Sequence, residues 1–134
     1  MAPRSSGLVY LDSSALVKLI AVEPETSALR RELARWPART SSALATVEVA
    51  RTARRLGQGA PALVPRVLAG LRLLAIEPIL PAAMHIGGTM LRSLDAIHLA
   101  TAASIAHELS AVITYDQRMA AEGASLGLNV LAPA

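Results

Sequence analysis

The chain has 134 residues, of which 53% are hydrophobic and 17% are charged, so its composition favours one folded domain over a disordered chain. Cysteine is absent, which excludes a disulfide framework and the usual thiolate zinc sites. Charged or polar residues interrupt its apolar stretches well before the roughly 20 residues of a membrane span, and residues 1–7 lack a signal-peptide pattern. We therefore expect one domain over residues 1–134 in a soluble, cytoplasmic protein with no membrane partner.

The net charge is +3, and twelve of the thirteen basic residues are arginine. This balance is compatible with a polyanionic partner and equally with an arginine-rich genome composition, because net charge bears on association rather than on fold. The aromatic residues are only Tyr10, Trp36 and Tyr115. They are too few for a base-stacking platform, which argues against a single-strand binding module of the stacking type.

Apolar periodicity and helix-boundary residues predict strands that alternate with helices. A short apolar strand at 8–11 leads into a helix that begins with the capping residues 12–14 and extends through residue 20, and Pro24 ends it. The further predicted elements are, in chain order, a helix over 25–36, a strand over 39–42, a helix over 43–56, a helix opened by Pro61, a strand over 72–76, a short helix from Pro81, an apolar helix over 93–109, a strand over 111–114, a helix over 117–126 and a strand over 128–131. This alternation predicts an α/β fold around a parallel sheet with right-handed crossovers.

Two of the three aspartates, Asp12 and Asp116, directly follow predicted strands. Because the carboxyl ends of parallel strands lie on one edge of a sheet, the topology brings these two residues to the same edge. Each also has an ordinary explanation as a helix N-cap. Asp95 has a similar one in the first turn of its helix, where the helix dipole favours a carboxylate.

Glu48 lies in the middle of a predicted helix among apolar neighbours, where capping cannot explain it. A buried carboxylate there needs a partner, which is either a cation shared with the other acids or an arginine further along the same helix, Arg51 or Arg55. Clustered carboxylates repel one another by ~4 kcal/mol per pair at about 4 Å with an effective dielectric of about 20, and a hard cation removes that penalty. All-oxygen ligation favours Mg²⁺ or Mn²⁺ over Zn²⁺.

Four segments carry a family resemblance: VYLDSSALVKL, SALATVEVARTARR, LRSLDAIHLATA and VITYDQRMAAEGASLGLNV. In order and spacing they resemble the four acidic motifs of PIN-domain proteins, particularly the VapC-type toxins of toxin–antitoxin pairs. The resemblance covers nearly the whole chain. It implies a three-layer α/β/α fold around a mostly parallel sheet, endoribonuclease activity that requires Mg²⁺ or Mn²⁺, a homodimer, and neutralisation by a small cognate antitoxin.

The resemblance also implies roles for individual residues. By position, Asp12 and Asp95 are similar to the two principal metal ligands, Glu48 to the third catalytic acid, and Asp116 to the fourth, which acts through water or a second ion. A metal held there would lower the pKa of a bound water for in-line attack on an RNA phosphodiester.

Other residues near the motifs have weaker signals. Ser14 and Thr114 match the small polar residues that support the first and last acids, whereas Met119 stands where the family usually has an aromatic residue. His98, one turn after Asp95, is interpreted as a satisfied core histidine rather than a site residue. Three arginines are candidates for contacting RNA phosphates, with a solvated helix face as the alternative: Arg51, Arg54 and Arg55.

Other acid-bearing α/β proteins fit less well. A phosphotransfer receiver domain needs a lysine after a late strand, and the only lysine is Lys18. A haloacid-dehalogenase-type phosphatase needs a second aspartate two residues after Asp12, where Ser14 stands. The main alternative is a PIN-like module that binds RNA or a protein without cutting, and the full set of four acids favours a nuclease over it.

Overall fold

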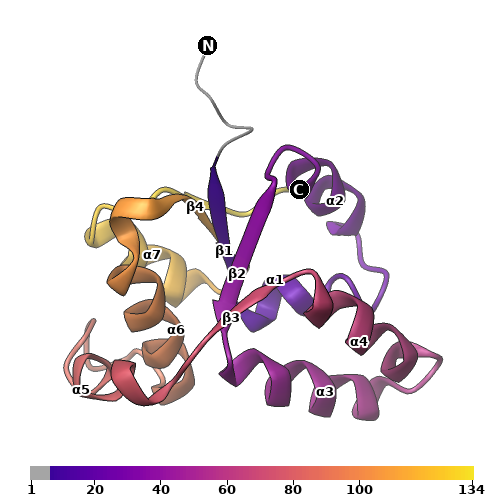
Figure 1. The fold of residues 1–134 in the computed structure, drawn as a ribbon, viewed down its shortest axis with the longest axis horizontal. Coiled ribbons are helices and arrows are strands. Elements are labelled where there is room, and N and C mark those ends of the chain that lie inside the picture. Colours follow the sequence, from indigo (N-terminus) through magenta and orange to yellow (C-terminus); the bar gives the residue numbers. More distant parts are fainter. Residues whose placement is uncertain (1–6) are drawn as a thin grey trace.

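The computed structural model describes residues 7–134, so the N-terminal segment in which no signal peptide is expected lies largely outside the described residues. Five strands form one sheet in the order β3-β2-β1-β4-β5 (Figure 1). Their bounds are β1 Leu8–Leu11, β2 Ala38–Ser42, β3 Arg72–Leu74, β4 Leu109–Ile113 and β5 Val130–Leu131. Each neighbouring pair runs parallel, which confirms the predicted parallel sheet.

Helices cover both faces of this sheet, as a three-layer α/β/α fold requires (Figure 1). On one face lie α1 Ser13–Val17, α2 Thr26–Leu33, α3 Leu44–Leu56 and α4 Ala60–Ala69. On the other lie α5 Leu80–Ala83, α6 Ser93–Ser104 and α7 Gln117–Ser125, with short 3₁₀ turns at Glu77–Ile79 and Ala106–Glu108. No helix within residues 7–134 is long and apolar enough to cross a membrane.

The two cores follow from the alternation of side chains along the central strand β1. Val9 and Leu11 point to the face covered by α1–α4, whereas Tyr10 points to the opposite face. Successive residues of a strand point to opposite sides of a sheet, so a strand buried on both faces is apolar at every position. The fully apolar run LVYL therefore marks β1 as the middle of the sheet, where β2 and β4 pair with it on either side.

Some predicted boundaries are wrong. The helix expected over 93–109 ends at Ser104, and a 3₁₀ turn then leads into β4 at Leu109. Ile105 and Leu109 continue the apolar pattern through this turn, so periodicity alone does not mark it. The helix expected to reach residue 20 is also short, because α1 ends at Val17 and the chain continues in turns.

Candidate functional site

An open groove with a volume of about 600 Å³ lies at the carboxyl ends of β1 and β4. One side of α3 and the first turn of α6 also line it. All four acids from the sequence line it: Asp12, Glu48, Asp95 and Asp116. Because β1 and β4 are neighbours in the sheet, the residues that follow them, Asp12 and Asp116, reach the same edge. The structure thus brings together acids that are up to 104 positions apart, with each one supplied by a different element.

Asp12 is the most buried of these acids, with 2% of its surface exposed. Its Oδ1 accepts hydrogen bonds from the backbone N–H of Ala15, at 3.1 Å, and from Ser14 Oγ, at 2.6 Å, while its Oδ2 accepts one from Thr114 Oγ1, at 2.5 Å. Burial raises the pKa of the Asp12 carboxyl above its ordinary value, and the hydroxyl donors oppose that rise. The chain therefore holds this carboxylate in a fixed orientation despite the cost of burying its charge.

Ser14 and Thr114 connect this first acid to the segment that carries the last one. Each hydroxyl donates its single proton to Asp12. The Ser14 oxygen also accepts the backbone N–H of Tyr115, at 2.9 Å, and the Thr114 oxygen accepts that of Asp116, at 3.1 Å. The start of α7 is thereby tied to the start of α1. The two hydroxyl residues lie where supporting side chains are expected.

The capping interpretation of the two aspartates also holds. Asp12 is the N-cap of α1, and Asp116 is the N-cap of α7, where its Oδ1 accepts the backbone N–H of Met119 at 2.8 Å. In each case the cap uses one carboxylate oxygen. A helix cap and a position on a shared groove are therefore compatible, because the strand-to-helix turn that needs a cap also lies at the carboxyl edge of the sheet.

Asp95 lies in the first turn of α6 and is partly exposed to the groove. Burial raises the pKa of its carboxyl, and the negative charges of Asp116 and Asp12 raise that pKa further. These carboxylates thus repel one another. Oxygen donors that repel one another are the donor set that a hard divalent cation such as Mg²⁺ relieves.

Within the described part of the chain, no three His, Asp or Glu side chains stand close enough to form a ready-made ion cage. This arrangement still fits Mg²⁺, which keeps several waters and is typically bound by one or two carboxylates together with substrate phosphates. Asp12, Asp95 and Asp116 are the acids whose charges act on one another at the groove. They are the residues that would hold such an ion.

Glu48 has a partner that the sequence did not reveal. Its Oε1 lies 2.7 Å from His98 Nε2, whereas neither Arg51 nor Arg55 forms an ion pair with it. The alternative of an arginine partner is therefore wrong, because Glu48 on α3 is hydrogen-bonded instead to a fully buried histidine on α6. The interpretation of His98 as a satisfied core histidine is confirmed, but this core histidine also contacts a groove acid.

The candidate RNA-contacting arginines separate into two groups. Arg51 and Arg55 line the groove, whereas Arg54 is not among the residues that line it. Arg92, at the N-cap position of α6, also lines the groove and was missed by the sequence analysis. Its signal was present in the third motif, where Arg92 stands three residues before Asp95, but a single exposed arginine gives no reason to prefer it.

Comparison with known proteins identifies the family of this chain. Residues 9–123 match the family model of the PIN domain. In Mycobacterium tuberculosis, Ribonuclease VapC46 is 46% identical over 126 residues, covering 93% of this chain and 97% of that protein. Ribonuclease VapC47 is 41% identical over 132 residues, and Ribonuclease VapC35 is 44% identical over 136 residues, each covering 94% of this chain and 97% of the relative.

A solved structure also shares the fold. It is described as a toxin–antitoxin complex from Klebsiella pneumoniae, and it matches with a TM-score of 0.67 over 96% of this chain and 98% of its own. Its sequence is 24% identical, so this likeness bears on the fold alone. The family match and the relatives above 40% identity show that the chain belongs to the PIN-domain family and, within it, to the VapC type.

Proposed function

We propose that the protein is an Mg²⁺- or Mn²⁺-dependent endoribonuclease and the toxin of a toxin–antitoxin pair that acts on cytoplasmic RNA. The observation that carries this proposal is the convergence of four acids from four different elements on one groove, in a chain whose relatives are named ribonucleases. Oxygen-only donors at an open groove suit a metal that contacts both protein and phosphate.

The four acids have distinct parts in this proposal. Asp12 and Asp95 would hold the ion, with Asp12 oriented by Ser14 and Thr114. Asp116 would complete the carboxylates around the ion, directly or through a water molecule, and Glu48 would orient water at the scissile phosphate. A bound divalent ion would lower the pKa of a coordinated water and offset the charge that develops on the phosphate.

RNA would lie along the groove over α3 and the start of α6. Arg51, Arg55 and Arg92 are exposed at its walls, so their guanidinium groups can contact phosphate oxygens next to the acids. Leu44, Val47 and Leu94 provide apolar surface between them. This combination of charge and apolar wall suits a single-stranded segment better than a duplex, since unstacked bases can lie against apolar side chains.

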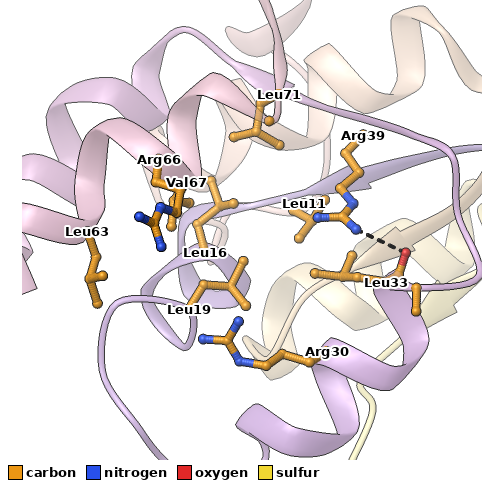
Figure 2. A pocket seen from close by; sticks show the side chains of 12 residues that line it. Leu11, Leu16, Leu19, Arg30, Leu33, Arg39, Leu63, Arg66, Val67 and Leu71 are labelled. Carbon is orange, nitrogen blue, oxygen red and sulfur yellow. Dashed lines mark hydrogen bonds between the residues drawn. The ribbon is translucent and has the colours of Figure 1, made fainter.

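A second cavity offers a surface for the antitoxin. A pocket with a volume of about 340 Å³ lies between α1, α2 and α4, and Figure 2 shows the side chains that line it. Its walls are mostly apolar, and no acidic residue within 7–134 lines it. The apolar walls are made by Leu11, Leu16, Leu19, Leu33, Leu63, Val67 and Leu71.

The charge of this pocket defines the partner that it suits. Arg30, Arg39 and Arg66 reach its edge, and Arg39 Nη2 donates to the backbone carbonyl of Leu33 at 3.2 Å (Figure 2). Arg30 and Arg66 form no ion pair with another described residue. An antitoxin segment that carries both apolar and acidic side chains would complement the leucines and the arginines together. The resemblance also implies a homodimer, which we retain as part of the proposal.

The proposal is tested with purified protein and a mixed RNA substrate in Mg²⁺. We expect Asp12→Asn and Asp95→Asn to remain folded and to lose cleavage by at least about a hundredfold, because each removes one charged ligand. Glu108→Gln, at an exposed acid outside the groove, is the matched control and should cleave normally. Full activity in either aspartate variant would overturn the proposed site.

The alternative function is an RNA- or protein-binding module that does not cut. It predicts RNA that is retained by the protein but stays intact at every Mg²⁺ concentration. The four acids argue against it, because a groove that only binds an anion would bind better without negative charges on its floor.

A further inference from the structure

A row of three hydrogen-bonded polar side chains, Tyr10, His98 and Glu48, leads from the central strand to the groove. Tyr10 on β1 and His98 on α6 are both completely buried. Tyr10 Oη lies 2.7 Å from His98 Nδ1, and His98 Nε2 lies 2.7 Å from Glu48 Oε1. The two rings meet edge to face, with centroids 5.9 Å apart. Of these three residues, only Glu48 lines the groove.

The contact between Ser42 and Tyr10 is consistent with a direction that runs from Tyr10 through His98 to Glu48. The backbone N–H of Ser42 donates to Tyr10 Oη, at 3.2 Å, so the phenol oxygen accepts there and its own proton is available to His98. A neutral imidazole that accepts at Nδ1 must carry its proton on Nε2, which is the nitrogen that faces Glu48.

The location of these residues links the row to the other acids. Tyr10 precedes Asp12 by two positions, and His98 follows Asp95 by one helical turn. Glu48 Oε1 is occupied by the histidine, and Oε2 forms no hydrogen bond within residues 7–134. The side chain of Glu48 is 17% exposed, at the groove wall. One carboxylate oxygen is thus anchored in the core, and the other is left for the groove.

We propose that His98 is a positioning residue of the nuclease, held by Tyr10 in the tautomer with the proton on Nε2, and that it orients Glu48 so that Oε2 faces the groove. The catalytic consequence of this inference rests on the proposed function, whereas the tautomer of His98 and the orientation of Glu48 do not depend on RNA cleavage. The role resembles that of the outer partners of metal-site ligands, whose loss costs about 10- to 100-fold in activity.

The tautomer is tested directly by ¹H–¹⁵N NMR of the histidine side chains in the metal-free protein. We expect His98 to have a protonated Nε2 and an unprotonated Nδ1, and Tyr10→Phe to shift the Nδ1 resonance because its donor is lost. A proton on Nδ1 in the wild-type protein would overturn the proposal. This measurement does not depend on RNA cleavage, so it decides the tautomer even if the protein cuts no RNA and the proposed function is wrong.

The positioning role is tested by comparing kcat and KM for RNA cleavage. His98→Leu keeps the side-chain volume but removes the donor, and kcat should fall by about 10- to 100-fold with little change in KM. His98→Gln keeps an N–H near the position of Nε2 and should recover most of the loss. His107→Leu, at an exposed histidine in the turn after α6, is the matched control and should match the wild type.

A purely structural role for His98 predicts a different pattern. Leucine and glutamine would then lower activity in proportion to their effect on thermal stability, and glutamine, as a buried amide without a second partner, would be the worse of the two. That order, or a wild-type kcat in folded His98→Leu, would overturn the proposal. Because His98→Gln leaves the Tyr10 hydroxyl without its acceptor, Tyr10→Phe/His98→Gln serves as a second rescue variant if the single variant does not fold.

Discussion

Thr114 Oγ1 donates to Asp12 Oδ2 across a distance of 2.5 Å, although 102 positions separate the two residues in the sequence. The bond joins the ends of two adjacent parallel strands, β1 and β4. The same hydroxyl accepts the backbone N–H of Asp116. One threonine therefore orients the first acid and positions the turn that carries the last one.

We expect Thr114→Val to lower Mg²⁺-dependent cleavage and apparent Mg²⁺ affinity by about 10- to 100-fold, as loss of an outer hydrogen-bond partner usually does. Valine fills the same volume but leaves Asp12 Oδ2 and the Asp116 N–H without this partner. Thr114→Ser retains the hydroxyl and is the control, which should stay close to wild type. A Mg²⁺ titration of the cleavage rate measures both effects, and equal curves for valine and serine would contradict this role.

The metal-free protein should lose stability as the pH rises through the acid range. The folded-state pKa values of Asp12 and Asp95 lie above the ordinary carboxyl value of 3.8, so between the ordinary and the raised values the folded state binds more protons than the unfolded state. Stability then falls with rising pH over this window and stays lower above it. Thermal melts of Asp12→Asn should show a flatter pH dependence and no loss at neutral pH, since asparagine is also a good N-cap.

Added Mg²⁺ should reverse this loss at neutral pH. A ligand that binds only the folded state at 100 times its Kd adds ~2.7 kcal/mol to the free energy of unfolding. The gain should shrink at low pH, where the carboxyls are protonated, and in Asp12→Asn. A melting temperature that does not respond to Mg²⁺ or Mn²⁺ at neutral pH would argue against ion binding by these acids.

The arginines of α3 offer a matched pair. Arg51 lines the groove and Arg54 does not, although both are exposed on the same helix. Arg51→Ala should weaken RNA binding and reduce the dependence of log K on log salt concentration by about one unit, as expected for the loss of one phosphate contact. Arg54→Ala should change neither quantity. Identical binding curves for the two variants would assign both arginines to a solvated helix face.

The apolar pocket should matter for the antitoxin and not for cleavage. Arg66→Glu reverses a charge at its edge and is expected to weaken antitoxin binding by at least about tenfold, or ~1.4 kcal/mol. Arg31→Glu changes an exposed arginine of α2 that does not line this pocket and should bind normally. Calorimetry with the protein encoded beside this chain's gene measures both. If the two variants bind the antitoxin with equal affinity, the antitoxin binds at a surface other than this pocket.

The parallel sheet could be predicted from the sequence, because the alternation of strands and helices depends on local pattern. The shared edge of Asp12 and Asp116 followed from topology in the same way. Helix ends were less predictable. Around residue 105 the apolar pattern continues through a turn, so the boundary depends on how the chain enters β4.

The partner of Glu48 could not be predicted, because it lies on a different helix, α6, which only the fold brings near α3. The spacing along α3 indicated Arg51 and Arg55 as candidate ion-pair partners, because they lie one and two turns after Glu48 on the same helix. The structure instead places His98 there, 50 positions further along the chain. The sequence indicates which groups need partners, and contacts between distant elements decide which partners they obtain.

The central claim is that the grouped acids make RNA cleavage depend on a divalent ion. The most direct measurement maps the ends of RNA treated with purified protein in Mg²⁺, in Mn²⁺ and in excess chelator, with Asp95→Asn in parallel. We expect defined internal cuts in both metals, no cuts in chelator, and none by Asp95→Asn. Cuts of equal extent in chelator, or intact RNA under every condition with folded wild-type protein, would contradict the claim.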